Sequence, residues 1–158
     1  MVERLSNGTL KLINLLAIFI FICMTLITFG QVVTRYAFNF SIFWGEEFAR
    51  YAMIWVTFLG AALGVSKGEH TRIDFFIKLL PKNLKKGMEI LNRLLCITFL
   101  VVISYYTISM LPNTMNLNSP ALNVPVGIVH SILPFSGILM SFYLLIEIIQ
   151  IITGRREE

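Results

Sequence analysis

Four long apolar stretches recur along this 158-residue chain, and they constrain its fold more than any other feature. Each is about 20 residues or longer, the length that an α-helix needs to cross a hydrocarbon core of about 30 Å. Only 14% of the residues are charged, too few to cover the surface of a soluble domain of this size. The sequence therefore predicts an all-α, polytopic membrane protein.

We expect the chain to form one domain with four transmembrane helices, which are separated by shorter connecting segments. We place the spans at residues 12–36, 44–66, 90–111 and 126–153. Pro112 is expected to end the third span, and the fourth is expected either to kink at Pro134 and Gly137 or to lie shallow in its first turns. The first uncharged stretch, residues 12–34, exceeds the ~7–15 residues of a cleaved signal core, so we expect this helix to be retained.

Positive charge is distributed unevenly between the two ends of these spans. Ten lysines and arginines fall in the N-terminal segment, between spans two and three, or in the C-terminal tail. On the other side we count Arg35 and Arg50. Because positively charged segments stay in the cytoplasm, both termini are predicted to be cytoplasmic. The net charge of +4 then reflects segments that face anionic lipid, and we expect no nucleic-acid partner.

The segment between spans two and three, residues 70–89, has apolar side chains at helical spacing and charged side chains opposite them. We predict amphipathic helices here that lie along the inner membrane surface and contact phospholipid. An ordinary solvated loop is the alternative. The residues assigned to this arm are Arg72, Phe76, Ile77, Leu80, Lys82, Lys85 and Lys86.

A charged cluster opens the second span, in the segment FWGEEFARY. Glu46 and Glu47 lie four and three residues before Arg50, so on a helix both acids face the arginine. An aromatic belt surrounds the cluster at the membrane interface, formed by Tyr36, Trp44 and Tyr51. The cluster is either an interfacial anchor or a partly buried network with Arg35 that holds a loop or a partner subunit.

Small and polar residues mark faces of three spans. Gly60 and Gly64 in span two satisfy the small-xxx-small pattern that lets a second helix approach closely. A polar stripe in span one is expected to face protein rather than lipid, and consists of Thr25, Thr28 and Gln31. A small-residue face in span four consists of Gly127, Ser131, Pro134, Gly137 and Ser141. These faces together indicate a permanent membrane partner.

No pattern in the sequence points to catalysis, a metal or a cofactor. His70 and His130 are predicted on opposite sides of the membrane, so they cannot share one haem iron. Cys23 and Cys96 lie inside apolar runs without a C-x-x-C pair, as expected for small packing residues.

A transporter that works alone usually has an ionisable group near mid-membrane, and none is found here. Glu147 comes nearest and is expected to pair with Arg155 or Arg156, or to snorkel.

Residues 31–74, QVVTRYAFNFSIFWGEEFARYAMIWVTFLGAALGVSKGEHTRID, closely resemble the small membrane subunit of tripartite ATP-independent periplasmic (TRAP) transporters, the DctQ-like family. The segment SPALNVPVGIVHSILP, residues 119–134, also resembles the approach to that family's last helix. The matched residues are Arg35, Tyr36, Trp44, Glu46, Glu47, Arg50, Tyr51, Trp55, Gly60, Gly68, His70 and Asp74.

The resemblance implies a subunit of the bacterial inner membrane that works with a large DctM-like membrane subunit and a periplasmic substrate-binding protein. The large subunit would hold the substrate and sodium sites, and this chain would be a fixed scaffold without a substrate site. The short tail after Glu147 leads us to expect no fused large subunit. Substrates of such systems are organic acid anions such as sialic acid or C4-dicarboxylates. The alternatives are an independent small membrane transporter and a haem- or quinone-linked membrane enzyme subunit.

Overall fold

The computed structural model describes residues 2–66 and 82–153, with the backbone alone for residues 2–7, 82, 83 and 85. Four of its helices are long and apolar enough to cross a membrane. The helices are α1 (Val2–Phe38), α2 (Phe43–Ser66), α4 (Lys82–Met115), α5 (Val126–His130) and α6 (Ile132–Ile152). The only β pairing in the described ranges is one bridge between Asn118 and Pro125. The all-α fold and the four predicted spans are therefore confirmed.

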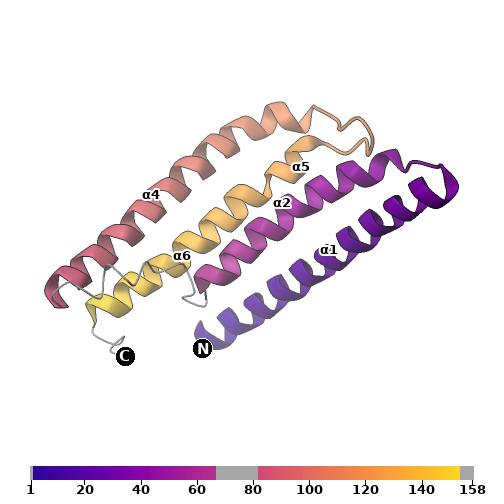
Figure 1. The fold of residues 1–158 in the computed structure, drawn as a ribbon. Helices are drawn as coiled ribbons and strands as arrows, with labels where there is room; N and C mark the ends of the chain where they lie inside the picture. Colours follow the sequence, from indigo (N-terminus) through magenta and orange to yellow (C-terminus); the bar gives the residue numbers. More distant parts are fainter. Residues whose placement is uncertain (1, 67–81, 154–158) are drawn as a thin grey trace.

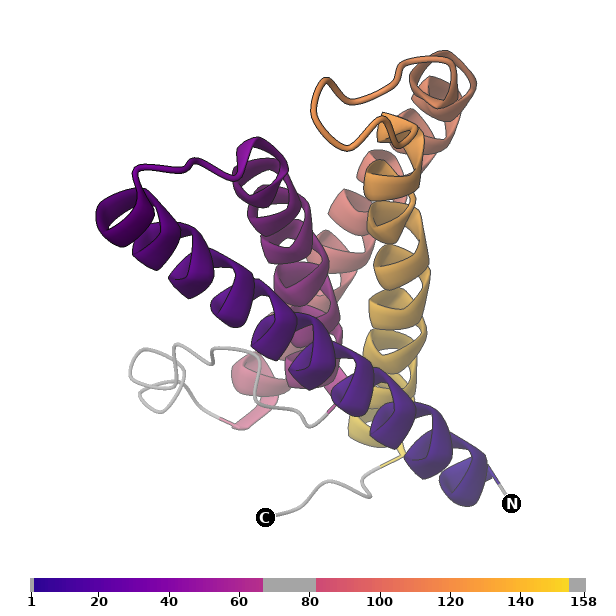
Figure 2. The ribbon, with the colours of Figure 1, turned by 90° about the vertical axis from the view of Figure 1, so that its right-hand side faces the viewer.

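The long helices lie side by side in the order α1, α2, α6, α4 (Figure 1). Helices α2 and α6 form the middle of this layer, while α1 packs on α2 and α4 packs on α6. Figure 2 shows α1 crossing α2 obliquely instead of closing the layer into a compact bundle. An open layer leaves long apolar faces uncovered on both sides, which suits a chain surrounded by lipid or by another membrane protein.

The buried core follows the contacts of the two middle helices. Ala62 and Val65 of α2 pack with Met140 and Leu144 of α6 in one cluster. Small side chains on α2 let the helices approach closely, so van der Waals contact replaces the hydrophobic drive that is weak inside a bilayer. A second buried cluster joins α1, α2 and α6 and contains Ile13, Ala17, Leu59 and Ile132.

Helix α4 was expected to end at Pro112 but continues to Met115. A proline removes one backbone donor, yet side-chain hydroxyl and amide groups can restore hydrogen bonds to nearby carbonyls. The Thr114 hydroxyl donates to the Leu111 carbonyl at 3.1 Å, and the Asn116 amide donates to the Pro112 carbonyl at 3.1 Å. The last turn therefore persists despite the proline.

The fourth span is interrupted at Ser131, between α5 and α6. Pro134 has no N–H for the carbonyl of His130, and its ring crowds that carbonyl, so the irregularity falls one turn before the proline. The Ser131 N–H donates to the Gly127 carbonyl at 2.9 Å, so the chain direction is kept. The irregularity in the fourth span thus lies at Ser131, N-terminal to Pro134 and Gly137, where a kink was expected.

Residues 82–89 are helical, as predicted for this part of the arm, but they form the first turns of α4 and not a separate helix. Residues 82–111 contain one glycine and no proline, and nothing interrupts the helix before the third span. Lys86 is exposed on α4, while the side chains of Lys82 and Lys85 are not described. Predicted residues that lie outside the described ranges are His70, Arg72, Asp74, Phe76, Ile77 and Leu80.

Candidate functional site

Glu47, in the first turns of α2, ties this helix to the segment between α4 and α5. Its Oε2 accepts hydrogen bonds from the backbone N–H groups of Ala121 at 2.8 Å and Leu122 at 3.0 Å. Its Oε1 accepts one from the Tyr51 hydroxyl at 2.8 Å. A carboxylate with several donors forms charge-assisted hydrogen bonds, which are stronger than neutral ones. Glu47 therefore joins elements that are far apart in the sequence.

The segment that Glu47 holds is closed by its own backbone. The Ser119 N–H donates to the Val124 carbonyl at 2.9 Å, and the Asn123 N–H donates to the Ser119 carbonyl at 3.1 Å. Asn123 adopts a left-handed conformation with φ of 54°, which asparagine tolerates better than most residues. Ser119 is 2% exposed and interacts through its side chain with Glu47 and Tyr51. This turn presents two consecutive N–H groups to one carboxylate.

Glu46 and Arg50 form the predicted i,i+4 pair, with 3.4 Å between Glu46 Oε1 and the arginine. Both side chains are more than two-thirds exposed, so the pair contributes little to stability. The predicted pairing of Glu47 with Arg50 is wrong, because Glu47 turns instead to Tyr51 and the loop. In the described parts of the chain, no hydrogen bond or ion pair joins Arg35 to these three residues.

The aromatic residues of the predicted belt lie in different surroundings. Tyr36 and Trp44 are exposed, as an interfacial position requires, while Tyr51 is half-buried against Glu47. Trp55 is half-buried and packs against the cluster that joins α1, α2 and α6. The cluster at the start of α2 thus holds a loop through Glu47 and Tyr51, without Arg35.

The small-residue face of the fourth span packs against this chain's own α4. A Cβ placed on Gly127 would lie 2.9 Å from the Met115 backbone nitrogen, and one placed on Gly137 would collide with Ser104 Oγ. This face therefore does not support the inference of a partner. Gly60 and Gly64 differ, since a Cβ at either position would meet, outside the backbone of its own helix, no atom of the described residues within 4 Å.

Only part of the polar stripe predicted on span one contacts another helix. Thr25 and Thr28 are exposed, and their hydroxyls donate to carbonyls of their own helix at 2.8 Å. Gln31 alone approaches a second helix, with its Oε1 3.0 Å from the Cβ position of Gly45 in α2. The two threonines do not pack against the rest of the described chain.

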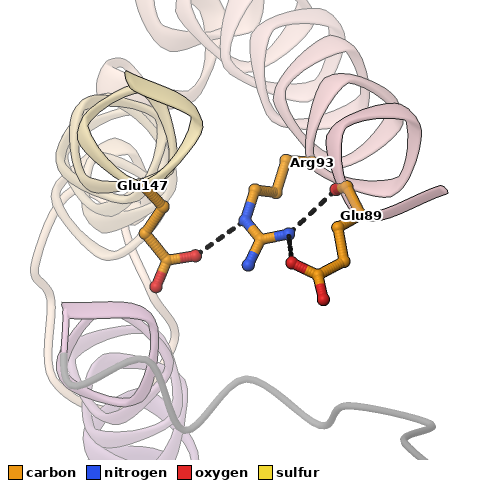
Figure 3. A network of polar contacts seen from close by, with 3 residues as sticks. All are labelled: Glu89, Arg93 and Glu147. Carbon is orange, nitrogen blue, oxygen red and sulfur yellow. Dashed lines mark hydrogen bonds and ion pairs between the residues drawn. The ribbon is translucent and has the colours of Figure 1, made fainter. Parts of the chain in front are cut away.

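A second polar cluster, at the other end of the layer, joins α4 to α6 (Figure 3). Arg93 Nε donates to Glu147 Oε2 at 2.9 Å, and an Arg93 terminal nitrogen donates to the Glu89 carbonyl at 2.9 Å. The same nitrogen lies 3.7 Å from Glu89 Oε2. The side chains of Arg93 and Glu147 are only 10% and 14% exposed. The ion pair is largely buried, so removing either partner would leave the other charge buried without its counter-charge.

Arg93 was not among the predicted residues, and Glu147 was expected to pair with Arg155 or Arg156, which lie outside the described residues, or to snorkel. The structure gives Glu147 a partner in the neighbouring span instead. A signal was present, because Arg93 and Glu147 are single opposite charges in two otherwise uncharged spans. Opposite charges at such positions usually pair.

The described part of the chain contains no group of three or more His, Cys, Asp and Glu side chains that could hold a metal ion. Cys23 and Cys96 are free thiols. The two polar clusters fix helices to each other and to a loop.

Comparison with known proteins identifies one family. Residues 24–154 match the family described as "Tripartite ATP-independent periplasmic transporters, DctQ component". The chain is 29% identical over 157 residues to a TRAP transporter small permease protein of Haemophilus influenzae, covering 96% of this chain and 94% of that protein.

Two further relatives are named for their substrates. One is the C4-dicarboxylate TRAP transporter small permease protein DctQ of Vibrio cholerae, 30% identical over 101 residues, which cover 64% of this chain and 44% of that protein. The other is the sialic acid TRAP transporter permease protein SiaT of Haemophilus influenzae, 29% identical over 127 residues. That match covers 78% of this chain and 20% of the much longer relative.

Proposed function

The chain belongs to the DctQ-component family of TRAP transporters, and from that premise we propose that it is a scaffold subunit that binds no substrate. Members of this family are transporter components and not enzymes. In the proposal, the chain anchors a large DctM-like subunit that carries the substrate and sodium sites. A periplasmic binding protein delivers the substrate to that large subunit.

The position of the charged side chains carries this proposal. Glu47, in the first turns of α2, and the Arg93–Glu147 pair, which joins the N-terminal part of α4 to the last turns of α6, are engaged in contacts within the chain. From Leu94 to Ile146 the sequence has no Asp, Glu, Lys or Arg. A chain that carried an ion or an anion by itself would need a charged or ion-binding group along that path. The open layer instead offers long apolar surfaces to a second membrane protein.

The proposed transport reaction is sodium-coupled uptake of an organic acid anion. A C4-dicarboxylate and sialic acid, named for two of the relatives, are both organic acids that are anionic at neutral pH. We propose one of these two classes as the substrate. Because the chain is proposed to have no substrate site, the choice between them belongs to the binding protein and the large subunit.

The proposed orientation places both termini in the cytoplasm of a bacterium and the chain in its inner membrane. Lysines and arginines concentrate at the ends of the spans that would face inward. Glu46 and Arg50 then lie at the outer face, exposed and available to the large subunit or to the docked binding protein.

Co-expression with the large subunit and the binding protein tests the proposal. We expect the chain to co-purify with the large subunit and to be needed for sodium-dependent uptake into vesicles. Uptake of solute by the chain reconstituted alone would contradict the scaffold role.

Charge reversal at the outer face tests the contact itself. Arg50→Glu is expected to reduce complex recovery or uptake, because it replaces the cation of an exposed pair with a second acid. Lys11→Glu, an exposed change near the N-terminal end of α1, is the matched control. Normal complex and normal uptake with Arg50→Glu would remove this contact from the proposal.

A further inference from the structure

Arg93 in α4 and Glu147 in α6 contact each other at the point where the uncharged part of each helix ends. Beyond Arg93, α4 continues without charge to Met115, about 22 residues or ~33 Å at 1.5 Å per residue. Before Glu147, α5 and α6 together run without charge from Val126, about 21 residues or ~32 Å. Both lengths match a hydrocarbon core of about 30 Å.

The chemistry of α4 changes on the other side of Arg93. Its first 11 residues, Lys82–Asn92, contain Lys82, Lys85, Lys86 and Glu89. Charged residues at this density belong in the headgroup layer or in water, and not in hydrocarbon. The ion pair therefore lies where the polar part of α4 meets its apolar part.

The geometry of the pair resists sliding of the two helices. Arg93 Nε and Glu147 Oε2 are 2.9 Å apart, and Arg93 is also held by the carbonyl of Glu89. A slip of α4 along α6 by one turn, about 5.4 Å, would separate the charges and move one of them toward the hydrocarbon. Each helix thus fixes the height of the other.

We infer that Arg93 and Glu147 are positioning residues that set the depth of the α4–α6 pair in the membrane. The pair sits at the inner edge of the hydrocarbon core, and the first turns of α4 project from it toward the cytoplasm as a continuous helix. Over residues 82–92 this projection is about 16 Å long. Lys86, exposed on this projection, is then near the lipid headgroups, where it adds attraction to anionic lipid.

Cysteine accessibility tests this depth directly. Met88, Leu91, Leu95 and Phe99 share one face of α4, and each is more than half exposed. Single cysteines at these positions, in the full chain with Cys23→Ala and Cys96→Ala, are treated with a membrane-impermeant maleimide in right-side-out and inverted vesicles. We expect fast labelling at 88 and 91 in inverted vesicles only, where the cytoplasmic side faces the reagent. Labelling at 95 and 99 should be at least about tenfold slower, because hydrocarbon excludes the reagent.

Removing the Arg93–Glu147 pair should move the boundary between the quickly and the slowly labelled positions of α4. In Arg93→Met/Glu147→Leu the uncharged part of α4 lengthens to residues 90–115, about 39 Å, which exceeds the core and allows sliding or tilt. Labelling at 91 is then expected to fall by about threefold or more as this turn enters the core. Glu89→Gln is the matched control and should leave the pattern unchanged, since the Arg93–Glu147 bond remains.

A boundary anywhere other than between 91 and 95 in the otherwise unchanged chain would overturn the inference. An unchanged boundary in the double variant would show that the pair does not set the depth, and would overturn it too. If that double variant does not accumulate, Arg93→Gln/Glu147→Gln with the same four cysteines replaces it, because it also removes both charges, and the same shift is required. The labelling needs no partner subunit, so it can fail while the proposed assembly holds.

Discussion

Glu47 Oε2 lies 2.8 Å from the backbone nitrogen of Ala121, a residue 74 positions later in the chain. A side chain in the first turns of α2 thus accepts backbone hydrogen bonds from the 116–125 segment. The N–H groups of Ala121 and Leu122 have their acceptor in this carboxylate. Because the half-buried Leu122 N–H needs an acceptor, the conformation of the loop depends on Glu47.

Replacing Glu47 with alanine should free this loop. We expect a lower unfolding free energy, because the substitution removes a charged acceptor from the exposed Ala121 N–H and the half-buried Leu122 N–H. Amide hydrogen exchange at Ala121 and Leu122 should rise in the same variant. Glu46→Ala is the control, because its pair with Arg50 is exposed and worth about 0.3–0.5 kcal/mol. Equal effects of the two substitutions would contradict the anchoring role of Glu47.

The sequence predicted the spans because hydropathy depends on the chain's own residues and on the thickness of the bilayer. It also predicted that FWGEEFARY forms the start of a helix with Glu46 facing Arg50, since i,i+4 contacts are local. It could not predict where Glu47 points. The donors that bind Glu47 come from Tyr51 and from a loop that is distant in sequence. These three hydrogen bonds are more favourable for Glu47 than one exposed ion pair with Arg50.

The same limit explains the errors at helix ends and at the small-residue faces. Whether α4 ends at Pro112 depends on hydrogen bonds from Thr114 and Asn116 that the proline alone does not reveal. Periodicity locates Gly137 on a small face but cannot say that α4 of the same chain covers it. The Arg93–Glu147 pair requires knowing that their helices are neighbours.

Gly137→Ala should push α6 away from α4. The added Cβ would collide with Ser104 Oγ, and Ser104 is itself buried. Overpacking of this kind costs about 1–3 kcal/mol. Thermal unfolding in detergent measures the loss, and Ser104→Ala in the same chain should recover most of it by removing the opposing oxygen. Without such recovery, the close contact would not be the cause.

Gly60→Ala supplies the contrasting control on α2. Apart from its own helix backbone, the described chain has no atom within 4 Å of the added Cβ, and alanine favours a helix over glycine by about 0.5–1 kcal/mol. The isolated chain should therefore be unchanged or slightly more stable. Destabilisation of the isolated chain by Gly60→Ala would mean that this face is covered within the chain.

Gly127→Ala should be as harmful as Gly137→Ala but should resist rescue. Here the added Cβ would lie 2.9 Å from the backbone nitrogen of Met115, and backbone cannot be trimmed by mutation. Met115→Ala removes the side-chain contact alone, so the double variant should stay about 1–3 kcal/mol below the unsubstituted chain. Full recovery in the unfolding measurement would place the conflict in the Met115 side chain instead.

The Arg93 cluster should respond unequally to the loss of each member. Arg93→Met leaves the largely buried carboxylates of Glu89 and Glu147 without their shared cation, so we expect about 3–5 kcal/mol of destabilisation. Glu147→Gln keeps an acceptor for Arg93 Nε and leaves Glu89 as its counter-charge, so about 1–2 kcal/mol is expected. Glu89→Gln should cost less than about 1 kcal/mol, because its backbone carbonyl still accepts from Arg93 at 2.9 Å. Unfolding free energies in one detergent give the order, and a larger loss for Glu89→Gln than for Arg93→Met would contradict the assignment of Arg93 as the centre of the cluster.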